Sequence, residues 1–132
     1  MNDAARRQLT EPRVELLRRE RAHAFSSQHA DLAITASLEL ARVLVGNHFV
    51  ANAAHELELT LDQLSQGQGL DVVDSPAELW RLLLTLAVLY KGLADEPRAR
   101  LTASAAWRCA SHHHCELGRE RARAFLRQLP YR

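Results

Sequence analysis

Two apolar segments constrain the fold of this chain more than any other feature. Residues 31–46 and 76–92 carry Leu, Ala, Val and Ile almost all round a helical wheel. Helices with that pattern are buried inside a domain, whereas a surface helix keeps one polar side. Aromatic residues make up only 5% of the chain, and strands favour aromatic and β-branched residues. We therefore predict an all-α domain with these two helices at its centre.

Four further helices follow from periodicity and from start and stop signals. In SPAE, Ser75 predicts a helix cap, Pro76 the first helical residue and Glu78 the partner in a capping box. The 132 residues fit one domain, in which 1–10 are predicted to form a flexible N-terminus and 67–74 a loop. We expect about six helices in stacked antiparallel hairpins, with a plain helical bundle as the alternative. The four further helices are predicted at about 11–27, 49–66, from 97 onward, and 116–129.

Part of the chain repeats with a shift of 46 residues, under which the Leu-Ala pairs at 40–41 and 86–87 coincide. The segment LTLAVLYKGLADEPRARLTASAAW, residues 84–107, resembles a tetratricopeptide repeat, a family of stacked antiparallel helix pairs. Its helices pack through a small residue and a Tyr on the first helix and small residues on the second. The matching residues are Ala87, Tyr90, Ala99 and Ala106. Ser111 stands where the family has its closing proline, which is a departure from the pattern.

The tetratricopeptide resemblance implies a groove on the inner helices that receives a peptide or helix from a partner protein. Arg42 and Lys91 are the cations of this predicted groove, and either could hold a carboxylate. Leu38 and Leu84 stand where the family's two-carboxylate clamp needs polar side chains. A simpler interpretation is that Arg42 and Lys91 are cations at helix ends. The predicted groove residues are Thr35, Leu38, Arg42, Leu84, Val88 and Lys91.

Cysteine and histidine gather in the segment CASHHHC, residues 109–115. Cys109 and His113 are four residues apart and share a helix face, and Cys115 follows a predicted helix break. These three residues are the candidate ligands of a metal-responsive protein, since zinc prefers thiolate and imidazole ligands. Histidines at a helix C-terminus also interact favourably with the helix dipole. We favour that second interpretation and predict no metal and no cofactor.

Sixteen of the seventeen basic residues are arginines, a bias typical of a GC-rich bacterial genome. Two groups of arginines near the ends of the chain make a nucleic-acid-associated subunit an alternative, because basic helices neutralise phosphates. No nucleic-acid-binding motif is present, and the net charge is only +1. Acidic residues in the middle of the chain and basic ends could also attract two copies head to tail, as a homo-dimer. The arginines concerned are Arg6, Arg7, Arg18, Arg19, Arg21, Arg119, Arg121, Arg123 and Arg127.

No set of catalytic residues can be recognised in the sequence. Glu56, Glu58 and Asp62 are predicted on the outer face of their helix, so no buried carboxylate pair is indicated. The sequence contains no glycine-rich phosphate loop and no nucleophile elbow. It also contains no signal peptide and no apolar run of membrane-spanning length, and two cysteines are consistent with a reducing cytoplasm. The sequence therefore predicts a cytoplasmic, non-enzymatic adaptor or regulatory protein that acts on a protein or peptide partner, without binding a membrane.

Overall fold

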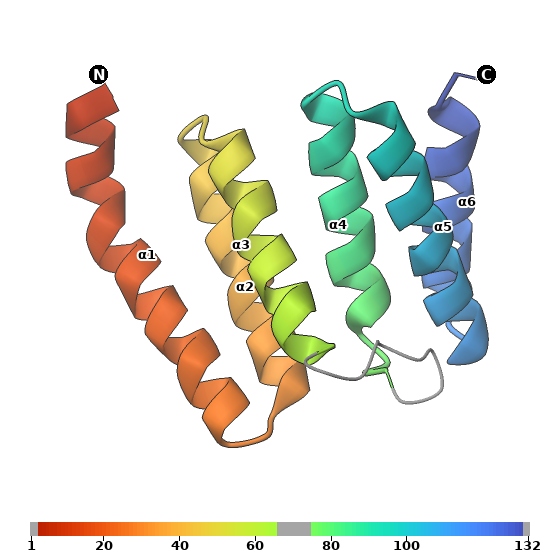
Figure 1. Ribbon diagram of the computed structural model, residues 1–132, viewed down its shortest axis with the longest axis horizontal. Helices are drawn as coiled ribbons and strands as arrows, with labels where there is room; N and C mark the ends of the chain where they lie inside the picture. Colours follow the sequence, from red (N-terminus) through yellow and green to blue (C-terminus); the bar gives the residue numbers. More distant parts are fainter. Residues whose placement is uncertain (1–2, 66–74, 131–132) are drawn as a thin grey trace. The chain divides into compact units, whose positions relative to one another are not determined.

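The computed structural model describes the backbone of residues 3–65 and 75–130, and the side chains from residue 11 onward. These residues form six helices and no strand (Figure 1). The all-α prediction is therefore confirmed. The helices are α1 Asp3–Ser26, α2 Ala30–Gly46, α3 Val50–Leu64, α4 Leu79–Gly92, α5 Glu96–His112 and α6 Glu116–Gln128. Helix α1 begins eight residues before the predicted start at residue 11, and the predicted loop 67–74 lies outside the described residues.

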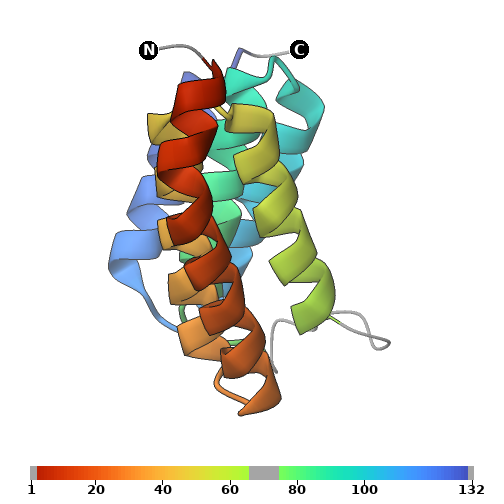
Figure 2. The same cartoon turned by 90° about the vertical axis from the view of Figure 1, so that its left-hand side faces the viewer.

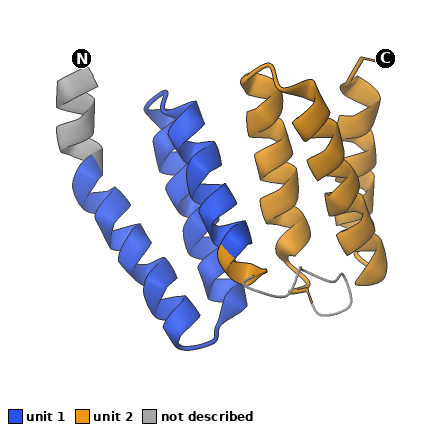
Figure 3. Ribbon diagram, viewed as in Figure 1, with its two compact units in different colours: residues 1–62 blue, residues 63–132 orange. Residues whose placement is uncertain are grey.

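The chain forms two compact units, residues 1–62 and 63–132, which we describe separately (Figure 3). Unit 1 consists of α1, α2 and nearly all of α3. Figure 2 shows α1 lying against the α2–α3 pair, with α2 to one side and α3 to the other. Unit 2 consists of α4, α5 and α6, in which α5 packs against both other helices. That both units belong to one domain stays a prediction.

Four turns of the same geometry connect the helices within the units. Each turn has three residues, of which the second has a positive φ between 56° and 67° although it is not glycine. The third residue donates its amide to the carbonyl five residues earlier, as in a Schellman motif. Helix α2 ends at Gly46 as predicted, yet the left-handed residue is two positions further on. The left-handed residues are Gln28, His48, Ala94 and His114.

The turns also show that the units repeat each other. The left-handed residues of unit 2, at 94 and 114, lie 66 residues after those of unit 1, at 28 and 48. Helices α2 and α5 have 17 residues each, and α5 begins and ends 66 residues after α2. The shift of 46 residues read from the sequence aligns only one pair of turns. The structural repeat is therefore a three-helix unit, longer than the two-helix repeat expected from the sequence.

The core of unit 1 includes a buried polar network. Glu56 is only 3% exposed, so its prediction on the outer face of α3 was wrong. Its carboxylate accepts hydrogen bonds from Arg18 Nε at 3.2 Å and from an Arg21 guanidinium nitrogen at 3.3 Å. Arg21 also donates to Thr60 Oγ1, which lies 2.6 Å from Ser37 Oγ. Burial lowers the pKa of Arg18, but the charge of Glu56 and hydrogen bonds to Glu56 and Glu15 raise it overall. This network ties all three helices of unit 1 together.

The core of unit 2 is apolar and closely packed. Helix α4 buries eight of its residues, including Trp80 and Leu86. The α5 face that holds Ala99, Ala103 and Ala106 is fully buried. A methyl group built on Gly118 of α6 would come within 2.7 Å of the Trp80 ring and 2.8 Å of another methyl group, that of α5 Ala110. Glycine is therefore required where α6 meets the other two helices.

The predicted start of α4 was wrong in one respect. The helix begins at Leu79, and the side chain of Glu78, the residue before it, makes no capping hydrogen bond. The Leu79 amide donates to the carbonyl of Pro76, so the residues before it form a turn rather than the first helical turn. Ser75, the predicted cap, is buried and directs its hydroxyl toward α5. Its tertiary contacts there replace the capping bond that the local sequence suggests.

Candidate functional site

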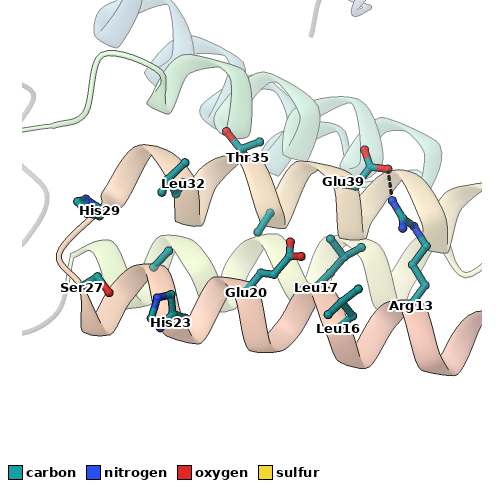
Figure 4. Close-up of a pocket in the computed structure, with 12 residues that line it drawn as sticks. Arg13, Leu16, Leu17, Glu20, His23, Ser27, His29, Leu32, Thr35 and Glu39 are labelled. Carbon is teal, nitrogen blue, oxygen red and sulfur yellow. Dashed lines mark hydrogen bonds and ion pairs between the residues drawn. The ribbon is translucent and has the colours of Figure 1, made fainter.

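A groove of about 610 Å³ lies between α1 and α2 in unit 1 (Figure 4). We call it the hairpin groove because the turn that joins the two helices closes one of its ends. It is lined by Arg13, Leu16, Leu17, Glu20, His23, Ala24, Ser27, His29, Leu32, Thr35, Ala36 and Glu39. A groove between two helices at a surface can receive a further helix or an extended peptide.

The groove combines a buried floor with exposed apolar walls. Leu17, Ala24 and Ala36 are at most 6% exposed and belong to the packed core. Leu16 and Leu32 are 50% and 59% exposed, although both are large apolar side chains. They come from different helices, α1 and α2, and both line the same groove. Their exposed surface remains available for burial by another molecule.

One part of the groove is closed by an ion-pair triad. Arg13 lies 3.1 Å from Glu39, and the same carboxylate accepts a second hydrogen bond from Arg42 Nε at 3.1 Å. Hydrogen bonds from Arg42, and to a lesser extent from Arg13, lower the pKa of Glu39. The hydrogen bond to Glu39 in turn raises the pKa of Arg42. The carboxylate is thus held ionised between two guanidinium groups. Glu20, further along α1, carries the other carboxylate of the groove.

The residues predicted to line one groove differ in position and exposure in the structure. Thr35 lines the hairpin groove. Arg42 is exposed but paired with Glu39, and Leu38 is half-buried. Leu38 and Arg42 belong to unit 1, whereas Leu84, Val88 and Lys91 belong to unit 2. A groove that uses all of these residues together stays a prediction.

The α4 members of the predicted groove are only partly available. Val88 is 50% exposed and Leu84 is half-buried. The Lys91 ammonium lies 5.8 Å from the centre of the Phe125 ring, a distance typical of a cation–π contact. Lys91 thereby links α4 to α6 within unit 2. A carboxylate ligand for Lys91 would compete with this contact.

The segment CASHHHC forms the end of α5 and the turn into α6. Helix α5 ends at His112, and His114 is the left-handed residue of the turn. Cys115 caps α6, since its Sγ accepts a hydrogen bond from the Gly118 amide at 3.4 Å. Cys109 is buried, and burial raises the pKa of its thiol, although a hydrogen bond with Ser75 lowers it in part. The helix-terminus interpretation of this segment agrees with the structure.

Cys109 and His113 do share a helix face, and both lie near Ser75. The Ser75 hydroxyl is 3.2 Å from His113 Nε2 and 3.8 Å from Cys109 Sγ. Cys115 is engaged as the cap of α6 and takes no part in this contact. Across the described residues no three His, Cys, Asp or Glu side chains are grouped so as to hold a metal ion.

The two groups of arginines differ in their roles. Arg18 and Arg21 bind Glu56 within unit 1 and are parts of its framework. On α6, Arg119 pairs with Glu116, whereas Arg121 and Arg123 are exposed and form no ion pair with any described residue. Arg127 is also exposed and without an ion pair to the described residues. The side chains of Arg6 and Arg7 lie outside the described part of the chain.

No protein-family model, curated protein or solved structure matches this chain. Among the helices of the described residues, none is both long and apolar enough to cross a membrane. Sequence reasoning did not find the hairpin groove, because it depends on which leucines are left uncovered. The one signal in the sequence was Leu16. It lies next to the buried Leu17 but outside the apolar stripe of α1, which indicates an apolar side chain left exposed at the surface.

Proposed function

We propose that this protein is a small helical adaptor that binds another protein through the hairpin groove. The observation that carries the proposal is the exposure of Leu16 and Leu32 on opposite walls of one groove. Exposed apolar surface that is concentrated and rimmed by charges is typical of protein interaction sites. The rim charges are Arg13, Glu20 and Glu39.

The tetratricopeptide-like arrangement remains part of this proposal. The α4–α5 hairpin buries Ala87, Tyr90, Ala99 and Ala106, the residues on which the resemblance was based. Their burial supports the expected packing of that helix pair. The interaction surface proposed here nevertheless lies on α1 and α2, away from those four residues in the sequence.

Site-specific photo-cross-linking tests the proposal. A photoreactive amino acid at position 32 in the groove should capture a discrete partner in cells of the native host. The matched control is position 59, because Leu59 is 41% exposed and lies on α3 of the same unit. The further change Leu16→Arg should abolish capture at position 32. Equal labelling at positions 32 and 59, or no captured protein at either, would contradict the proposal.

A further inference from the structure

Along α1 and into the first residue of the turn that follows it, the hairpin groove presents four side chains at helical spacing. Leu16, Glu20, His23 and Ser27 are spaced by four, three and four residues and all line the groove. Leu16 is 50% exposed. Glu20 is exposed, and it makes no ion pair or side-chain hydrogen bond with the described residues. The groove therefore offers an uncovered apolar group followed, one turn later, by an unpaired carboxylate.

Helix α6 presents a stripe with the same spacing on its solvent side. Gly118, Ala122 and Phe125 face the core of unit 2. The stripe consists of Leu117, Arg121, Ala124 and Gln128, and all four are exposed. Leu117 is 51% exposed, and Arg121 forms no ion pair within the described part of the chain. This stripe offers an uncovered apolar group followed, one turn later, by an unpaired cation.

We propose that the hairpin groove of one copy of this chain binds the α6 stripe of a second copy. With α6 parallel to α1, Leu117 lies beside Leu16 and Arg121 beside Glu20. One turn further the small Ala124 leaves room for the ring of His23. The proposal rests on the proposed function, since it names the partner of the same groove. Apolar burial supplies affinity, and the charge pair sets the register and the choice of partner.

The charges favour this contact over one between two identical grooves. Glu20 lies midway along the groove, between Arg13 and Ser27, so a two-fold contact brings it close to its own counterpart. Like charges at such a contact are repulsive, whereas α6 supplies the missing cation. A contact between the groove and α6 is heterologous, because it joins two different surfaces. It leaves one copy with a free groove and the other copy with a free α6. Association therefore continues beyond two copies until a ring closes.

Two charge reversals test the contact in full-length protein. Sedimentation velocity should show association that increases with protein concentration and weakens with salt, since the charge pair is exposed. Glu20→Arg and Arg121→Glu should each weaken association by about tenfold or more, because each places like charges opposite one another. An equimolar mixture of the two variants should associate again. In the mixture Arg121 of one variant meets Glu20 of the other, and the two introduced charges also pair.

Arg123→Glu is the matched control. It makes the same change in net charge two residues along α6, at an exposed position on another side of the helix. It should leave association unchanged, whereas Leu117→Arg should abolish it. If Arg123→Glu weakens association as much as Arg121→Glu does, the contact is not the one proposed.

Two results would overturn the inference. One is a wild-type protein that stays monomeric at every concentration, and the other is a variant mixture that does not recover. In either case, capture of a different protein from position 32 would leave the proposed function standing. Loss of all capture at position 32, including capture of a second copy, would refute the proposed function itself.

Discussion

Units 1 and 2 share the same turns at the same spacing but fill their cores with different chemistry. Unit 1 bridges its helices with the carboxylate of Glu56, a guanidinium group and two hydroxyl groups. Unit 2 places alanines at three of the four matching positions and Leu126 at the position that matches Thr60. The matched pairs, 66 residues apart, are Arg21 and Ala87, Ser37 and Ala103, and Glu56 and Ala122, and each of these alanines is 0% exposed. Helix spacing follows the size of the side chains at the contact. One pattern of turns thus accommodates both a polar core and an apolar one.

The largest expected effect concerns the polar core. Glu56→Ala should lower the free energy of unfolding by about 3–5 kcal/mol, because it leaves the largely buried guanidinium of Arg21 without its carboxylate. Urea denaturation followed by circular dichroism measures this change. Replacing both partners, Arg21→Leu with Glu56→Leu, should recover much of the loss and make the core resemble that of unit 2. A double variant that is less stable than Glu56→Ala would show that the two units are not interchangeable in this way.

A second pair of substitutions compares matching positions on α1 and α4. Leu86 of unit 2 is 2% exposed, whereas Glu20, 66 residues earlier, is exposed. Leu86→Ala should cost about 2–5 kcal/mol, as truncation of buried leucines does. Glu20→Ala should change stability by less than about 0.5 kcal/mol, as surface substitutions do. Similar losses in the two variants would contradict the different burial of the two helices.

Glycine offers a third comparison, within α6 and α2. Gly118→Ala should destabilise the protein by about 1–3 kcal/mol, since the added methyl group overlaps Trp80 and Ala110. Nothing lies within 4 Å of a methyl group added at Gly46. Gly46→Ala should therefore be neutral or stabilising by up to about 1 kcal/mol. Thermal melts of both variants measure the difference, and a stabilising Gly118→Ala would show that α6 is less tightly packed than described.

The smallest expected effect concerns the turns, which the two units share. Ala94 holds a φ of 62° and Gln28 one of 59°. A left-handed conformation costs an L-residue about 1–2 kcal/mol, and glycine avoids that cost while losing about 0.5–1 kcal/mol of entropy. Ala94→Gly and Gln28→Gly should each stabilise the protein by about 0.5–1 kcal/mol. Denaturant midpoints that fall in either variant would contradict the equivalence of the turns.

Local sequence patterns predicted the helices well, because helix formation depends mainly on residues that are close together in the sequence. The apolar segments 31–46 and 76–92 became α2 and α4, and the breaks near Gly46 and Gly92 were correct. The left-handed turns were not predicted, since Ala94 and His114 carry no glycine signal. Hydrogen bonding across the turn holds those residues in place despite their side chains.

Long-range pairing explains the errors. Glu56 looked like a surface residue because its partners, Arg18 and Arg21, are more than thirty residues away in the sequence. Ser75 looked like a helix cap because its contact with His113 is equally distant. The hairpin groove was missed for the same reason, since burial of Leu17 and exposure of Leu16 depend on where α2 lies.

The division into units has a practical consequence for spectroscopy. Residues 1–62 contain no tryptophan, tyrosine or cysteine, whereas both tryptophans and both cysteines lie in residues 63–132. Intrinsic fluorescence and thiol labelling therefore report on unit 2 alone, while far-ultraviolet circular dichroism reports on the helices of both units. Melting curves from these two signals will coincide if the units unfold together. A difference between the curves will give the stability of each unit without any label or truncation.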